Sequence, residues 1–378
     1  MQLISRRSCL QRIGLTLSAA AALPRTLHAA EGPIRPEKGE RDAIAAIARA
    51  FMEKHNVPGL SVAFAHHEMP AYSAGFGMAD EAAGEAMAPV HRFRIASVAK
   101  PITSVAIHSL IEQGKLKRED KVLGEDGILA AEYGKKITPD VAEITIHHLL
   151  THTCGGWGNN KDDPMFEHPD LDHHDLILRT LKDHKLEHAP GTHYSYSNFG
   201  YCLLGRVIEK LTGKSYAESL EKGILAKAGI KDMKIAGNTL ADRVENEVIY
   251  YGRNGEDPYS MNVRRMDSHG GWLASPSDLV KFLIHTADAG EANLLQKDTL
   301  KSMLAAGPPN PGYASGWSVN AVPNRWHGGS LPGTSTIAVR TASGMCWAGF
   351  TNARGEGIHG AIDKLMWDMA KAVPAWNA

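Results

Sequence analysis

The chain has 378 residues, of which 43% are hydrophobic, so it is long enough to bury a large core as two average domains or one large catalytic unit. Its 41 basic and 42 acidic residues give a formal net charge of −1 at pH 7, which argues against a nucleic-acid partner. The chain has nineteen histidines, which could include the ligands of a metal site.

The first 30 residues are predicted to be a signal peptide. Arg6 and Arg7 precede an apolar run at 13–23, and a stretch of small residues ends at Ala29 and Ala30, where we expect cleavage. The arginine pair favours the twin-arginine export route, and a general secretory signal is the alternative. The apolar run is too short to span a membrane. We therefore expect export to the periplasm or cell envelope, with no stable membrane span.

Helix and strand patterns occupy the two ends of the remaining chain. Apolar residues recur on one face of a predicted helix at 40–55, and strand patterns follow at 60–66 and 71–77, joined through residues 68–70. From 97 to about 306 the chain is mainly helical and loop-like, until the proline-rich stretch 308–312 breaks the pattern. Beyond it, the predicted elements are strands at 314–320, 325–327, 334–341 and 345–351 and a last helix at 357–372.

This order predicts an α/β (α+β) fold. The end segments, about 37–96 and 307–378, are expected to form one antiparallel sheet flanked by the first and last helices. The helical part, about 97–306, is then an insertion between strands. Residues 31–378 are predicted to form a single catalytic domain, and we expect a monomer.

The cysteines do not indicate a disulfide framework. Cys9 lies in the signal peptide, which leaves Cys154, Cys202 and Cys346 with no closely spaced pair. We expect each to be a small buried apolar residue, with one bridge as the alternative.

A loop at 161–175 is rich in aspartate and histidine. Such a loop could bind a cation, but a solvated loop that borders a cleft is the reading we favour. We therefore predict no metal and no cofactor.

Ser97 and Lys100 lie three residues apart at the start of a predicted helix, with an apolar continuation at 99–111. Positions three apart share a helix face, so the serine hydroxyl and the lysine amine can meet. A serine needs a neighbouring base to become a nucleophile, and a buried lysine can act as that base. The spacing alone is weak, because Ser219 and Lys222 repeat it in a charged amphipathic helix.

Tyr196 and Asn198 follow a turn at 190–192 and precede a helix predicted at 203–211. A tyrosine directed at Lys100 could act as a phenolate or pass a proton to a leaving group. Asn198 points to the same side of an extended segment and could bond Lys100 and a substrate carbonyl. An aromatic loop that packs on the core is the alternative.

The third stretch is His327, Gly328, Gly329 and Ser330, between strand patterns. Glycines on a strand often mark a close approach by a ligand or another backbone, so this edge could bind an extended substrate. The backbone N–H groups of Ser330 and Ser97 could form an oxyanion hole. His327 adds a donor or a charge that titrates near physiological pH. A glycine-rich hairpin with a surface histidine is the alternative.

Together and in this order, these stretches resemble the serine β-lactamase and penicillin-binding-protein superfamily. The similarity also covers 93–97, 149–153, 196–205, 270–275 and 328–333. The Tyr-x-Asn and His-x-Gly patterns look like the branch that contains class C β-lactamases, DD-carboxypeptidases, D-aminopeptidases and related carboxylesterases. In that branch many relatives have a small hydroxyl residue where this chain has Cys154.

The resemblance implies a serine hydrolase. Ser97 would attack a carbonyl, Lys100 would act as general base with Tyr196 as general acid and base, and Asn198, His327, Gly329 and Ser330 would bind substrate. Efficient β-lactamases of this branch usually carry lysine at the third motif, so His327 favours an esterase or a D-amino-acid peptidase with small-molecule or peptide substrates, such as peptidoglycan peptides. The alternatives are a true class C-type β-lactamase, a non-catalytic penicillin-binding-like protein, and a metal-dependent amidase that uses the loop at 161–175.

Overall fold

The computed structural model describes residues 32–134, 137–159, 162–287 and 293–376. Residues Pro33–Ala378 form one compact unit. The predicted signal peptide, residues 1–30, lies outside the described residues and stays a prediction. In the described part of the chain, no helix is long and apolar enough to cross a membrane.

The described residues form eleven α-helices and ten strands. The helices are α1 Lys38–His55, α2 Ala99–Glu112, α3 Ala130–Tyr133, α4 Pro139–Ala142, α5 Ile146–Leu150, α6 His173–Asp183, α7 Asn198–Thr212, α8 Tyr216–Leu220, α9 Pro276–Ile284, α10 Lys297–Met303 and α11 Ile358–Lys371. The strands are β1 Gly59–His66, β2 Met69–Asp80, β3 Glu85–Ala86, β4 Phe93–Arg94, β5 Lys234–Ile235, β6 Trp272–Ala274, β7 Ser318–Val319, β8 Arg325–Leu331, β9 Thr334–Arg340 and β10 Cys346–Thr351.

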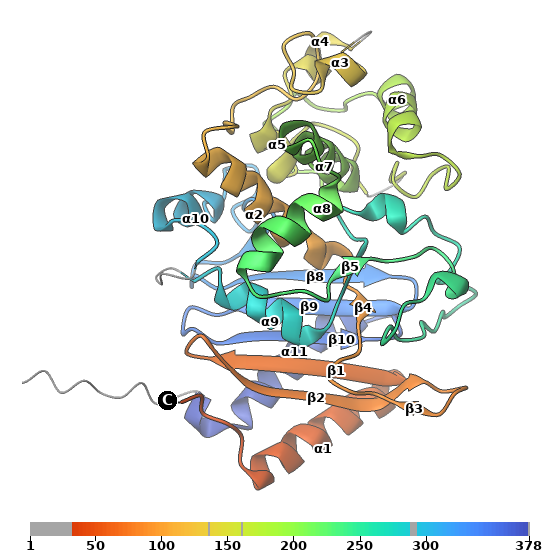
Figure 1. The fold of residues 1–378 in the computed structure, drawn as a ribbon, viewed down its shortest axis with the longest axis vertical. Helices are drawn as coiled ribbons and strands as arrows, with labels where there is room; N and C mark the ends of the chain where they lie inside the picture. The colour runs from red at the N-terminus through yellow and green to blue at the C-terminus, as the bar shows by residue number, and fades with distance from the viewer. Residues whose placement is uncertain (1–31, 135–136, 160–161, 288–292, 377–378) are drawn as a thin grey trace, which may run out of the picture. The chain divides into compact units, whose positions relative to one another are not determined.

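A seven-stranded antiparallel sheet in the order β3-β2-β1-β10-β9-β8-β7 joins the two ends of the chain. Figure 1 shows the orange β1 and β2 beside the blue β8, β9 and β10. The predicted α/β class with an antiparallel sheet is confirmed. A second sheet, β4-β6-β5, was not predicted, because its strands are two or three residues long and carry no periodic pattern.

Both faces of the large sheet are covered, and β1 is buried along its whole length. Leu60, Val62 and Phe64 pack in the core with α1 and α11, whereas the alternate residues Ala63 and Ala65 belong to the core of the opposite face. This alternation follows from the two-residue repeat of a strand. Helix α9 packs against β1 and β10. The sheet is therefore covered by an inserted helix as well as by the predicted first and last helices.

The described cysteines Cys154, Cys202 and Cys346 are buried and form no disulfide, as we expected.

A buried ion pair ties α7 to the loop that precedes β6. An Arg206 guanidinium nitrogen lies 2.6 Å from a carboxylate oxygen of Asp267, and both residues are buried. Glu209, one turn along α7, lies 2.7 Å from Arg206 Nε. Burial would raise the pKa of the Asp267 carboxyl group, but the net shift is downward, and the charge of Arg206 is the largest contribution in that direction. Because a buried charge is costly without its partner, this pair must form when the helical part packs.

We predict that Asp267→Asn destabilises the fold. The change leaves the buried Arg206 with Glu209 alone, so the free energy of unfolding should fall by about 3 kcal/mol. Urea denaturation followed by circular dichroism measures this. Asp42→Asn is the matched control, because its pair with Lys38 is exposed and should contribute little. Equal stabilities of the two variants would contradict the role given to the buried pair.

Candidate active site

Ser97 lies in η1, a 3₁₀ turn at Ala96–Val98 that leads directly into α2. The predicted helical continuation from residue 99 is confirmed. Ala96 has φ of +49°, in the left-handed region that alanine rarely adopts. Strand β9 holds the approach to this turn, because the Thr334 and Thr336 hydroxyls donate to the carbonyl oxygens of Arg94 and Ile95 at 3.2 and 2.8 Å. The sheet thus anchors the serine.

Lys100 is fully buried on the first turn of α2, and its amine has three hydrogen-bond partners. Nζ lies 3.0 Å from Ser97 Oγ, 2.7 Å from Asn198 Oδ1 and 3.0 Å from the carbonyl oxygen of His269. Burial lowers the pKa of Lys100 to about 7, against the opposing charge of Asp163. The amine is therefore partly neutral near physiological pH, which is the state that a base requires.

Tyr196 and Asn198 reach the same amine, as predicted. Lys100 Nζ lies 4.8 Å from the centre of the Tyr196 ring. Burial raises the pKa of Tyr196 well above its ordinary value, so the phenol keeps its proton. The predicted extended segment at Asn198 is wrong: α7 starts there and not at residue 203. The helix starts early because the Ser197 hydroxyl caps it by accepting the Gly200 N–H at 3.0 Å.

His327 is buried and belongs to a chain of hydrogen bonds that fixes its protonation. The Ser197 N–H donates to His152 Nδ1 at 3.1 Å, so His152 Nε2 carries the proton and donates to the Tyr313 hydroxyl at 3.1 Å. His327 Nδ1 donates to the Gly328 carbonyl, so its Nε2 accepts the Tyr313 hydroxyl at 3.1 Å. Tyr196 Oη lies 3.5 Å from the same nitrogen.

Burial lowers the pKa of His327 to about 3, and the charge of Lys100 adds to the effect. The expectation of a charge that titrates near physiological pH is therefore wrong. The residue is neutral there, and both ring nitrogens are already bonded within the protein. The reading of a surface histidine is also wrong.

Gly329 lets β8 approach η1. A Cβ atom at this position would lie 2.4 Å from the carbonyl oxygen of Ile95 and 3.0 Å from the Ala96 side chain. Ser330, Ser97, Tyr196 and His327 line one cavity of about 550 Å³. The structure therefore brings the predicted nucleophile, tyrosine and third-motif strand to one cavity, with the base directly behind Ser97.

In the described part of the loop at 161–175, which is residues 162–175, hydrogen bonds from other segments of the chain fix the backbone and Asp163. Arg265 donates to carbonyl oxygens along it, including those of His168 and Leu171 at 2.6 and 2.7 Å. Asp163 accepts the Asn198 side-chain N–H at 2.6 Å. No group of three or more His, Cys, Asp or Glu side chains suited to a metal ion is found among the described residues.

Three residues that contribute to the site carry no signal in the sequence. Asp163 was one acid among many in its loop, and Tyr313 had no motif around it. His269 contributes a backbone carbonyl, which no side-chain pattern reports.

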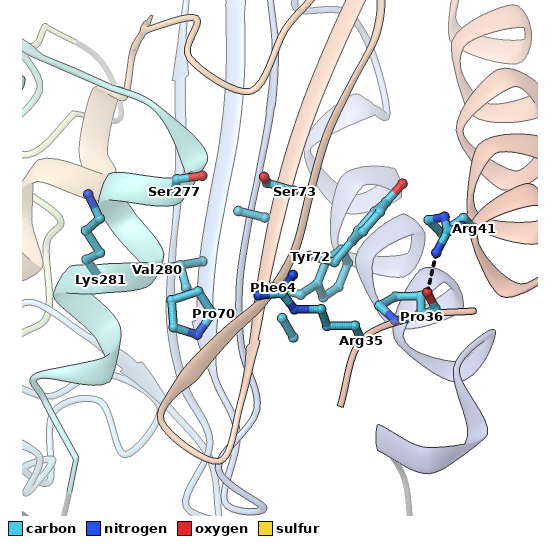
Figure 2. Close-up of a pocket in the computed structure, with 12 residues that line it drawn as sticks. Arg35, Pro36, Arg41, Phe64, Pro70, Tyr72, Ser73, Ser277, Val280 and Lys281 are labelled. Atoms are coloured by element: carbon cyan, nitrogen blue, oxygen red, sulfur yellow. Dashed lines mark hydrogen bonds between the residues drawn. The ribbon is translucent and has the colours of Figure 1, made fainter. Parts of the chain in front are cut away.

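A second cavity of about 390 Å³ lies elsewhere on the molecule. Figure 2 shows its lining side chains on the segment before α1, on α1 itself, on the β1–β2 hairpin and on α9, with Arg35, Arg41 and Lys281 among them. None of the predicted site residues lines it, so the candidate active site is the cavity at Ser97.

Comparisons with known proteins agree with this geometry. The beta-lactamase family model matches residues 44–370. Protein flp of Staphylococcus aureus (strain MRSA252) is 26% identical over 295 residues, which cover 76% of this chain and 57% of that protein. The chain thus spans little more than half the length of that relative. Esterase EstB of Burkholderia gladioli is 31% identical over 199 residues, which cover 49% of this chain and 48% of the esterase.

A solved structure has the same fold. D-amino acid amidase from Ochrobactrum anthropi SV3, complexed with L-phenylalanine amide, aligns with a TM-score of 0.74 at 22% identity, covering 90% of this chain and 99% of that chain. Because the family model covers most of the sequence and the predicted motifs meet in one cavity, the chain belongs to the beta-lactamase family, within the serine β-lactamase and penicillin-binding-protein superfamily.

Proposed function

We propose that this chain is a serine hydrolase that forms an acyl-enzyme at Ser97. The hydrogen-bond set of Lys100 carries the proposal. Two of its three partners, Asn198 Oδ1 and the His269 carbonyl, can only accept. A neutral amine has two N–H groups, which these two acceptors take, and one lone pair. The remaining partner, the Ser97 hydroxyl, can donate its proton to that lone pair. Deprotonated Lys100 is thereby directed at Ser97.

The proposed reaction moves protons from Ser97 towards the leaving group by way of Lys100 and Tyr196. Lys100 removes the hydroxyl proton as Ser97 Oγ bonds to the substrate carbonyl carbon. Tyr196, a phenol beside the amine, gives its proton to the leaving group as the carbonyl–leaving-group bond breaks, and it takes in return the proton that Lys100 removed from Ser97. The developing oxyanion would be bound by the backbone N–H groups of Ser97 and Ser330, two residues that line the same cavity. Water then hydrolyses the acyl-enzyme.

The charged groups that line the cavity determine which substrates it would favour. None of the described residues that line it is a lysine or an arginine. His327, at the third motif, is neutral, and Asp363 of α11 supplies a carboxyl group on the wall. A substrate carboxylate would meet no fixed cation in this lining, which weighs against a dedicated β-lactamase. An ester, or a D-amino-acid amide or peptide with a free amine, fits better.

The relatives support the same two substrate classes, since one is named an esterase and a structural neighbour a D-amino acid amidase. The proposed partner is a small molecule or peptide. If the protein is exported to the cell envelope, as the first 30 residues predict, peptidoglycan peptides would be available to it as substrates. We propose that the protein needs no cofactor and is a monomer.

We predict that Ser97→Ala abolishes hydrolysis of a p-nitrophenyl ester, because the variant lacks the oxygen that forms the acyl bond. The value of kcat/KM should fall on the order of 10³-fold or more. Ser219→Ala, at the other Ser-x-x-Lys pair, is the matched control and should keep full activity. Undiminished turnover by Ser97→Ala with an unchanged circular dichroism spectrum would refute the assignment.

We also predict a preference set by substrate charge. D-alanine p-nitroanilide has a free amine, and its N-succinyl derivative has a carboxylate with the same scissile bond. The amine form should be hydrolysed with a kcat/KM higher by about fivefold or more, because Asp363 attracts the ammonium and no lining cation balances the succinyl group. Steady-state kinetics at pH 7 measure the ratio. Preference for the succinyl form would contradict this account of the cavity.

A further inference from the structure

We propose that Asp163 is a positioning residue for Lys100, acting through the amide of Asn198. Its carboxylate orients that amide so that the oxygen faces the lysine, and its negative charge sets the pH range in which the lysine is a base. The inference rests on the proposed function, because it assigns Lys100 that role.

The hydrogen bonds allow one orientation of the amide. Asn198 Nδ2 donates to Asp163 Oδ2 at 2.6 Å, and Asn198 Oδ1 accepts from Lys100 Nζ at 2.7 Å. Asp163 Oδ1 is occupied as well, since it accepts the Met165 N–H at 3.0 Å. A carboxylate only accepts, whereas an amide has a donor end and an acceptor end. With Asp163 on one side, the acceptor end of Asn198 must face Lys100.

The backbone of Asn198 is held independently. Its N–H donates to Asn159 Oδ1 at 3.0 Å, and the Ser197 cap starts α7 at this residue. Asp163 is therefore needed for the direction of the amide and not for the position of the helix.

The carboxylate also acts on Lys100 through charge. Burial favours the neutral amine, and the Asp163 charge opposes it by stabilising the protonated form. The other titratable groups near the amine are His152, His269 and His327, all buried with lowered pKa values, and the phenols of Tyr196 and Tyr201. Burial raises the pKa of the Asp163 carboxyl group, and the charge of Glu167 adds to the rise, whereas the hydrogen bonds from Met165 and Asn198 and the charge of Lys100 oppose it.

Asparagine at position 163 cannot replace both functions. It has one acceptor end, so either the Met165 N–H loses its partner or an NH₂ group faces Asn198 Nδ2. The second case favours rotation of the Asn198 amide, which would place a donor against the amine of Lys100. Loss of the negative charge also makes protonation of Lys100 less favourable, so the pKa of the amine should fall.

The test is the pH dependence of kcat/KM for a p-nitrophenyl ester, from about pH 5 to 9, since this ratio reports the free enzyme. Wild-type kcat/KM should rise through a midpoint near pH 7, where Lys100 loses its proton. In Asp163→Asn the midpoint should move to lower pH and the plateau should fall by about tenfold to a hundredfold. Asp162→Asn, the same change one residue earlier on an exposed side chain, should match wild type.

A lower plateau with an unmoved midpoint would overturn the proposal, because it would show that Asp163 only supports its loop. An unchanged profile would overturn it too. If Asp163→Asn does not fold, Asp163→Ser is used, because its hydroxyl can still accept the Met165 N–H, and the same downward shift is expected. Activity retained by Ser97→Ala would instead refute the proposed function, so the two failures can be told apart.

Discussion

The buried amine of Lys100 is the constraint on which the rest of the site depends. Removing an amine from water favours its neutral form, and two acceptors take its N–H groups so that its lone pair points at the Ser97 hydroxyl. Each of these three partners comes from a different part of the chain: the turn before α2, the start of α7 and the loop before β6. The helical part must therefore pack correctly before Ser97 has a base.

The sheet contributes to the same centre from the other side. Threonines of β9 hold the backbone before Ser97, and Gly329 of β8 lets the strand approach that turn where any side chain would collide with Ile95. The left-handed Ala96 lies at this contact. The strained backbone of Ala96, directly before the nucleophile, is thus offset by hydrogen bonds from the sheet.

The groups that could be predicted from the sequence are those that occur in short motifs. Ser97 and Lys100 share a helix face, but the pair was predictable only because Tyr196 with Asn198 and then the His327 stretch follow it in the order of a known superfamily. What depends on burial or on distant contacts was missed. His327 was expected to titrate near neutrality, yet its burial prevents that. Asp163 could not be distinguished from its acidic neighbours, because only the folded chain places it against Asn198.

The most direct test of the account is to locate the covalent intermediate. Purified protein would be mixed with a p-nitrophenyl ester, quenched in acid within the first turnover, and mapped by peptide mass spectrometry. The account predicts one acyl group, attached to Ser97, and none on the Ser97→Ala variant. An acyl group on another residue, or ester turnover with Ser97 never modified, would contradict the central role given to the Ser97–Lys100 pair.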